Sequence, residues 1–259
     1  MWLAGDGFAL LLSLAAGLCT GIGGLAAVFA REKGRLVLPF SLGFAAGVMV
    51  MVSLADILPE AAAFISRRVQ NPFAGIYALF AMLGGMLLAA VGSRVLPEDA
   101  VWLSGGSGGD RSIARVGIMT MAAVMAHNVP EGIATFMAGC GERSLGISVA
   151  FAIALHNIPE GITVAIPVYY ATGSRGKGFF CALVSGLGEP LGALLAVWLL
   201  RPFLTELSLG VILGMVAGIM LYLSFDELIP AALRCHEKAP LAGILSGIVV
   251  MGAGLSFFG

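Results

Sequence analysis

The chain has 259 residues, of which 59% are apolar and only 11% are charged. A soluble domain of this size does not need so large an apolar fraction for its core, so the composition excludes an ordinary soluble protein and predicts an all-α polytopic membrane protein. The formal net charge is −1 and basic residues form no block, which argues against nucleic acid as a partner.

Short clusters of Lys and Arg separate apolar stretches that are long enough to cross a bilayer as helices. We therefore predict a single transmembrane domain, 1–259, with a flexible cytoplasmic loop at 94–112, where Gly and Ser are frequent. The eight predicted spans are about 7–29, 37–58, 73–93, 114–138, 145–170, 178–200, 207–229 and 240–258.

The first span, 7–29, is expected to be retained and not cleaved, because its basic residues follow the apolar stretch. If the N-terminus lies outside, ten Lys and Arg residues fall in cytoplasmic loops and four in the opposite loops. This distribution follows the positive-inside rule, so we predict that both termini are extracytoplasmic.

The second span carries a segment that returns in the seventh. GFAAGVMVMVSLADILP (43–59) aligns without a gap with GMVAGIMLYLSFDELIP (214–230). The two spans run in opposite directions, so the pair predicts an inverted-topology repeat and a 3+2+3 arrangement of spans. Helix packing is the alternative role for the Met and Ser of the segment, and contact with water for its acids. The candidates to line a path are Met49, Ser53, Asp56 and Glu227.

The fourth and fifth spans each carry one copy of a polar motif, HNVPEG (127–132) and HNIPEG (156–161). A helix advances about 100° per residue, so the glutamate of each motif lies between the histidine and the asparagine. The two histidines are equally far from the centre of the turn between the spans, which predicts equal depth near mid-bilayer. The candidate ligands are His127, Asn128, Glu131, His156, Asn157 and Glu160.

The sixth span adds Glu189, again followed by a proline in an apolar segment. An ionisable group at mid-membrane costs about 3 kcal/mol, so several acids in spans without Lys or Arg in their interiors need protonation, water or a bound cation. Imidazole, carboxylate and amide oxygen suit first-row divalent ions such as zinc, iron(II), manganese or cobalt. The alternatives are a satisfied core histidine for each imidazole and an interhelical hydrogen bond for each asparagine.

The two HNxPEG motifs, the Glu-Pro of the sixth span and the acids before Pro59 and Pro230 resemble the Zrt/Irt-like (ZIP) family of divalent-metal transporters, and in particular its short bacterial zinc-uptake (ZupT-like) branch. The resemblance covers essentially the whole chain. It implies a homodimer in the bacterial inner membrane, in which spans one, four, five and six move against a scaffold. Many members carry a His-rich loop between spans three and four, whereas 94–112 contains no histidine.

The resemblance also implies a binuclear site at mid-membrane. One ion would be held by His127, Glu131, His156 and Glu160, and the other by Asn128, Glu131, Asn157, Glu160 and Glu189. The implied function is import of divalent transition metal, zinc first and also iron(II), manganese, cobalt or cadmium, as transported ions and not as cofactors.

Alternating access by a secondary carrier is the leading mechanism, since the sequence has no phosphate-binding G-x-x-x-x-G-K-[S/T] motif. A passive divalent-cation channel stays open as an alternative. An intramembrane metal-dependent hydrolase is disfavoured because H-E-x-x-H is missing, so we predict that the chain is not an enzyme. The sequence does not fix the preferred metal or proton coupling.

Overall fold

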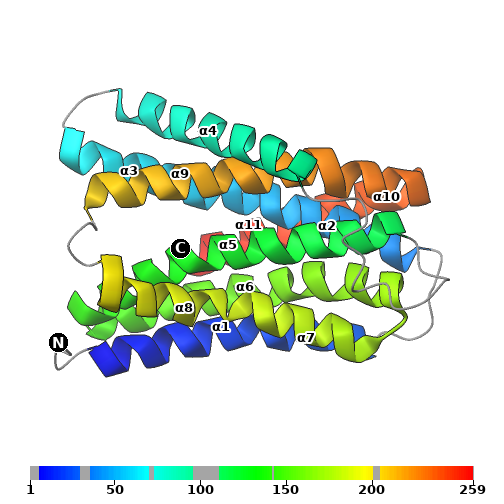
Figure 1. Ribbon diagram of the computed structural model, residues 1–259, viewed down its shortest axis with the longest axis horizontal. Helices are drawn as coiled ribbons and strands as arrows, with labels where there is room; N and C mark the ends of the chain where they lie inside the picture. Colours follow the sequence, from blue (N-terminus) through cyan, green and yellow to red (C-terminus); the bar gives the residue numbers. More distant parts are fainter. Residues whose placement is uncertain are drawn as a thin grey trace.

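The computed structural model describes residues 6–29, 36–69, 73–95, 111–141, 143–200 and 205–258. Regular structure in these ranges is helical throughout, as the composition predicts. The helices lie along the long axis of one bundle, with both marked chain ends toward the same end of it (Figure 1). The central part of the predicted loop, 96–110, lies outside the described residues.

Each predicted span corresponds to one helix or to a run of consecutive helical segments. In chain order these are α1 (Asp6–Phe29), α2 (Val37–Val52) with the π-helical turn η1 (Ser53–Ile57) and α3 (Leu58–Val69), α4 (Ala74–Val95), α5 (Arg111–Gly141), α6 (Arg143–Thr172), α7 (Arg175–Gly186) with α8 (Gly188–Leu195) and the π-helical turn η2 (Ala196–Leu200), α9 (Glu206–Leu223) with the π-helical turn η3 (Ser224–Leu228) and α10 (Ile229–Cys235), and α11 (Ala239–Phe258).

Seven of these eight runs are both long enough and apolar enough to cross a membrane. The remaining one, α5, is 31 residues long but less apolar, because it contains HNVPEG and begins with basic residues. The bundle thus has the helix lengths and composition of a polytopic membrane protein.

Two helical runs continue well past the ends of the predicted spans 37–58 and 207–229. Both predicted spans ended directly before a proline, because a proline normally breaks a helix. Each proline instead follows a π turn, in which the Leu58 and Ile229 N–H groups donate to the carbonyl oxygens of Ser53 and Ser224. The wider turn accommodates the ring, so the helix continues as α3 and as α10.

Close contacts between helix backbones hold the bundle together. The helix α2 packs along α11, and α9 packs along α4. A Cβ atom on Gly47 would overlap the carbonyl oxygen of Ile244, and one on Gly218 would overlap that of Met82. The G-x-x-x-G spacings of Gly43/Gly47 and Gly214/Gly218 thus serve close helix packing.

Two neighbouring glycines of α4 test this packing. A Cβ on Gly85 would overlap the carbonyl oxygen of Met215 in α9, whereas one on Gly84 would meet no atom within 4 Å. We expect Gly85→Ala to destabilise the fold by about 1–3 kcal/mol, because the helices must separate. Gly84→Ala, the matched control, should be neutral or stabilise by up to about 1 kcal/mol. Melting temperatures in detergent measure both, and equal effects would contradict the packing argument.

Candidate metal centre

The two HNxPEG motifs lie on α5 and α6, which pack against each other. Both helices run without a break through Pro130 and Pro159. Helix α1 packs along α6, and α8 packs along α5, so four helices enclose the two motifs. In Figure 1, α1, α5, α6, α7 and α8 form the part of the bundle opposite α4.

His127 lies at the centre of this group and is fully buried. Its Nε2 atom is 3.0 Å from Oε1 of Glu131 on the same helix and 3.4 Å from Oε1 of Glu160 on α6. Glu160 is fully buried and Glu131 is 7% exposed. One imidazole from α5 therefore contacts a carboxylate from each motif, so the two HNxPEG motifs face one another.

The two asparagines of the motifs make matching contacts. Asn128 Nδ2 donates to the carbonyl oxygen of Ser185 at 3.1 Å, and Asn157 Nδ2 donates to that of Ala16 at 2.9 Å. Both Oδ1 atoms are buried and accept no hydrogen bond within the described part of the chain. A buried oxygen without a donor costs about 1–3 kcal/mol. Each amide is thus fixed by its nitrogen and leaves its oxygen available to a cation.

Glu189 reaches the same region from α8. It lies in the first turn of that helix and is fully buried. One of its carboxylate oxygens accepts a hydrogen bond from Asn157 Nδ2, so the carboxylate joins α8 to α6. The structure therefore brings six of the seven predicted ligands into one group of four helices.

The seventh predicted ligand, His156, lies on α6 next to Asn157, but its side chain lies outside the described residues. A tetrahedral zinc site needs four donors. The described side chains alone form no group of three or more His, Cys, Asp or Glu arranged to hold a metal. The separations of 3.0 and 3.4 Å at His127 Nε2 are nevertheless close to the roughly 3.3 Å between two donors at about 2.0–2.1 Å from one tetrahedral ion. The pairs that His127 forms with Glu131 and with Glu160 therefore have a spacing that suits one ion. The role of His156 stays a prediction.

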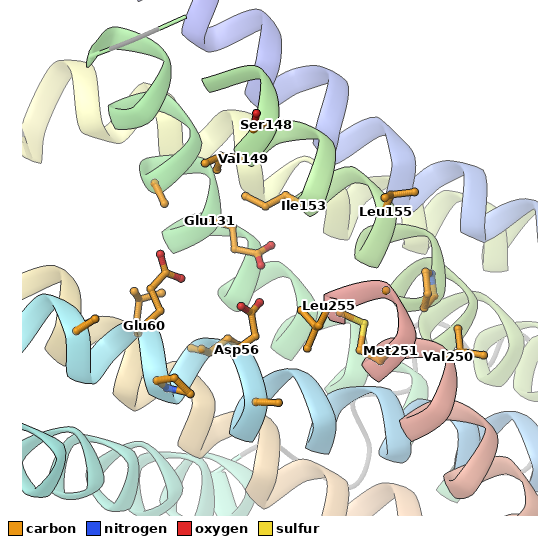
Figure 2. A pocket seen from close by; sticks show the side chains of 18 residues that line it. Asp56, Glu60, Glu131, Ser148, Val149, Ile153, Leu155, Val250, Met251 and Leu255 are labelled. Carbon is orange, nitrogen blue, oxygen red and sulfur yellow. The ribbon is translucent and has the colours of Figure 1, made fainter. Parts of the chain in front are cut away.

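A cavity of about 720 Å³ reaches this group from one side. Its walls are mainly apolar, but three carboxylates line it, those of Asp56, Glu60 and Glu131. Figure 2 shows the three pointing into a common space between α3 and α5. Glu131 belongs both to the cavity wall and to the contacts around His127, so it links the cavity to the buried group.

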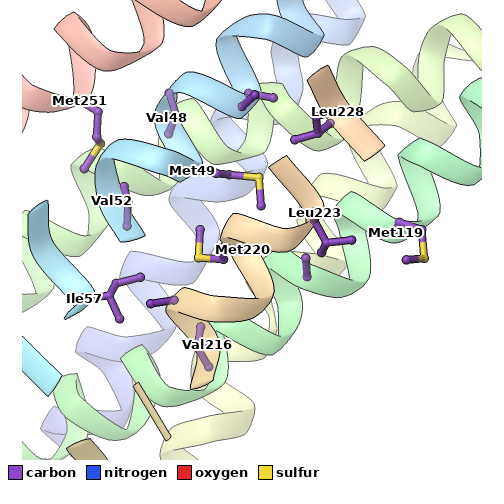
Figure 3. Close-up of a cluster of buried hydrophobic side chains, with 14 of the residues drawn as sticks. Val48, Met49, Val52, Ile57, Met119, Val216, Met220, Leu223, Leu228 and Met251 are labelled. Atoms are coloured by element: carbon purple, nitrogen blue, oxygen red, sulfur yellow. The ribbon is translucent and has the colours of Figure 1, made fainter. Parts of the chain in front are cut away.

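Of the four candidate path-lining residues, only Asp56 lines this cavity. Met49 is fully buried in an apolar cluster with Met220 (Figure 3), and the Ser53 hydroxyl donates to the Met49 carbonyl oxygen at 2.6 Å. Glu227 is partly buried in η3 and does not line the cavity. A path-lining role for these three stays a prediction.

Glu60 lines the cavity but was not among the residues predicted from the sequence. It follows Asp56 by four positions, so the two share a helix face, and that spacing was the available signal. The carbonyl oxygens of Ala16 and Ser185, which fix the two asparagines, were not predicted either. Backbone oxygens leave no mark in a sequence, so no signal could have identified them.

The chain is similar to known zinc transporters in sequence. The sequence model of the ZIP Zinc transporter family matches residues 105–254. The Zinc transporter ZupT of Streptococcus mutans is 40% identical over 257 residues, which cover 96% of this chain and 97% of that protein. The Zinc transporter ZupT of Akkermansia muciniphila is 44% identical over 253 residues, with coverage of 93% and 94%. That of Chlorobium chlorochromatii is 40% identical over 261 residues, with 97% of each chain covered.

Two histidines give a matched test of the site. His127 contacts both motif glutamates, whereas His236 caps α11, its Nδ1 accepting from the N–H groups of Lys238 and Ala239 at 3.1 Å. We expect His127→Ala to weaken zinc binding by about tenfold or more, because a nitrogen donor is lost. His236→Ala should leave the affinity unchanged. Calorimetric zinc titration of the purified protein measures both, and unchanged binding by His127→Ala would remove His127 from the site.

Proposed function

The chain belongs to the ZIP zinc transporter family, and on this premise we propose that it is a secondary carrier that imports zinc by alternating access. It is a multi-pass membrane transporter and not an enzyme. The observation that carries the proposal is the contact of one buried imidazole with a carboxylate from each repeated motif, at the inner end of a cavity.

The surroundings of the buried group differ on its two sides. The cavity includes residues near the start of α6 and the end of α11, which lie toward the end of the bundle that holds both marked chain ends (Figure 1). Further along α6, the side chains of Val164, Val168 and Tyr169 pack with those of Ala27 and Ala182 in an apolar cluster. A cavity on one side of the buried group and apolar packing on the other support alternating access. With both termini outside, this state faces outward.

We further propose that the site holds two ions. The contact of His127 Nε2 with both glutamates supports one position, and the two available amide oxygens beside Glu189 support another. In this proposal the first ion is bound by His127, Glu131, His156 and Glu160, and the second by Asn128, Asn157 and Glu189, with Glu131 and Glu160 bridging both. Imidazole, carboxylate and amide donors also suit iron(II), manganese, cobalt and cadmium as substrates.

An inverted-topology repeat in a 3+2+3 arrangement belongs to the same proposal. The aligned segments each contain a π turn at Ser-x-x-[Asp/Glu], and the hydroxyls of Ser53 and Ser224 donate to the carbonyl oxygens of Met49 and Met220 at 2.6 and 2.8 Å. The packing of α2 on α11 corresponds to that of α9 on α4. These matched features support two halves of opposite direction.

The cellular setting follows from the family and the charge distribution. We propose a homodimer in the bacterial inner membrane, with both termini extracytoplasmic. The excess of Lys and Arg in the loops that would then face the cytoplasm supports the orientation. The homodimer rests on the family resemblance alone.

Uptake into liposomes tests the function. Reconstituted protein should fill liposomes that contain a zinc-sensitive dye, and Glu131→Ala/Glu160→Ala should reduce uptake to the protein-free level, because both carboxylates of the buried group are lost. Asp226→Ala, which removes an exposed acid of η3, is the matched control and should transport normally. The rate should saturate with zinc concentration. Uptake that persists in the double variant would contradict the site, and flux that does not saturate would favour a channel.

A further inference from the structure

Helix α1 contacts α6 in the same way as the α7–α8 pair contacts α5. The carbonyl oxygen of Ala16 accepts from Asn157 of α6, and that of Ser185 accepts from Asn128 of α5. Since the asparagines hold the same place in the repeated motif, Ala16 and Ser185 hold equivalent places on the helices that flank it.

The register between the two flanking helices continues over two further turns. Gly23 lies seven residues after Ala16, and Gly192 lies seven after Ser185. A Cβ on Gly23 would overlap the carbonyl oxygen of Ile158, and one on Gly192 would overlap that of Val129. Ile158 and Val129 are the variable residues of the two HNxPEG motifs, so this second contact is again matched.

The glycine that ends each motif supplies a third match. A Cβ on Gly161 would overlap the carbonyl oxygen of Thr20, and one on Gly132 would overlap that of Glu189. Thr20 lies four residues after Ala16, as Glu189 lies four after Ser185. Thr20 therefore occupies on α1 the place that Glu189 occupies on α8.

The crossing of α1 and α7 has the reciprocal contact expected of two halves related by a local twofold axis. A Cβ on Gly17 would overlap the carbonyl oxygen of Gly186, and a Cβ on Gly186 would overlap that of Gly17. The two glycines directly follow Ala16 and Ser185. The four matched contacts share one register, so chance similarity between single residues does not explain them.

The Thr20 side chain is fully buried, and its hydroxyl has no hydrogen-bond partner among the described residues. A threonine within a helix normally donates to a carbonyl three or four residues earlier, as Thr163 does to Glu160 and Thr172 does to Val168. The corresponding carbonyls for Thr20 are those of Gly17 and Ala16, and that of Ala16 accepts from Asn157. The oxygen atom of the Thr20 hydroxyl therefore accepts no hydrogen bond from the described part of the chain.

We propose that Thr20 is a cation-facing residue of the transport site, where its hydroxyl is the neutral counterpart of the Glu189 carboxylate. This inference rests on the proposed function, because it presumes that the site binds a divalent cation. It assigns to α1 a direct part in the site and fixes the number of carboxylates at three, those of Glu131, Glu160 and Glu189. Ligand charge tunes the affinity of a cation site, and a transported ion must also leave. A hydroxyl at one of the two equivalent places keeps binding reversible.

Exchange of the two residues tests the proposal. Glu189→Thr should weaken zinc binding by about tenfold or more, because a charged donor is lost. The double variant Thr20→Glu/Glu189→Thr should restore the affinity to within about threefold of the unaltered protein, because the twofold axis returns a carboxylate to an equivalent place. Ser13→Glu/Glu189→Thr is the matched control: Ser13 is a buried hydroxyl of the same helix outside the matched register, and this variant should stay weak. Calorimetric zinc titration measures all four proteins.

A gentler pair of variants keeps the proposal testable if the exchanged protein does not fold. Thr20→Val is nearly isosteric, so it should lower zinc affinity about threefold or more while raising the melting temperature of the metal-free protein, because a buried hydroxyl without a partner is removed. Thr20→Ser should retain the affinity. These opposite effects on binding and stability would not arise from a purely structural role.

Failure of this inference is distinguishable from failure of the proposed function. If the unaltered protein binds and transports zinc but the exchange does not restore affinity, or if Thr20→Val binds zinc like Thr20→Ser, the role of Thr20 is overturned and the carrier stands. Absence of zinc binding and uptake by the unaltered protein would overturn both.

Discussion

Burial of carboxylates among apolar helices is the constraint on which this structure depends. Glu160 and Glu189 are fully buried and Glu131 nearly so, and the spans that hold them contain no Lys or Arg in their interiors. Each such group costs about 3 kcal/mol at mid-membrane. The described contacts offset part of that cost, with His127 beside two of the carboxylates and Asn157 donating to the third. A divalent cation would offset the rest, as the proposed metal site requires.

Close packing of backbones is what allows these contacts to form. The amides of Asn128 and Asn157 reach carbonyl oxygens on neighbouring helices, which requires helix axes closer than large side chains permit. The final glycine of each motif, Gly132 or Gly161, meets the flanking backbone where a Cβ would overlap it. The HNxPEG motif thus carries its candidate ligands and its packing surface together.

Much of this arrangement could be predicted from the sequence, because duplicated polar residues in apolar spans are conspicuous. The helical fold and the assembly of Glu131, Glu160 and Glu189 followed from those patterns. The part in the site that we propose for α1 could not be predicted, because it depends on the carbonyl of Ala16 and the hydroxyl of Thr20. A single threonine in an apolar helix is ordinary, and only the contacts of the folded chain relate it to Glu189.

The π turns explain why Asp56 lines the cavity while Met49 and Ser53 do not. Positions 49, 53 and 56 would share one face of a regular α-helix. A π turn adds one residue to the helical turn, which rotates the following side chains by about 100°. Met49 lies before the π turn and Ser53 at its first position, and both stay in the core, whereas Asp56 lies within the turn and lines the cavity. In the aligned segment, Met220 and Ser224 are likewise fully buried and Glu227 is only partly buried. One local distortion, present in both segments, thus separates packing residues from acids that spacing alone places together.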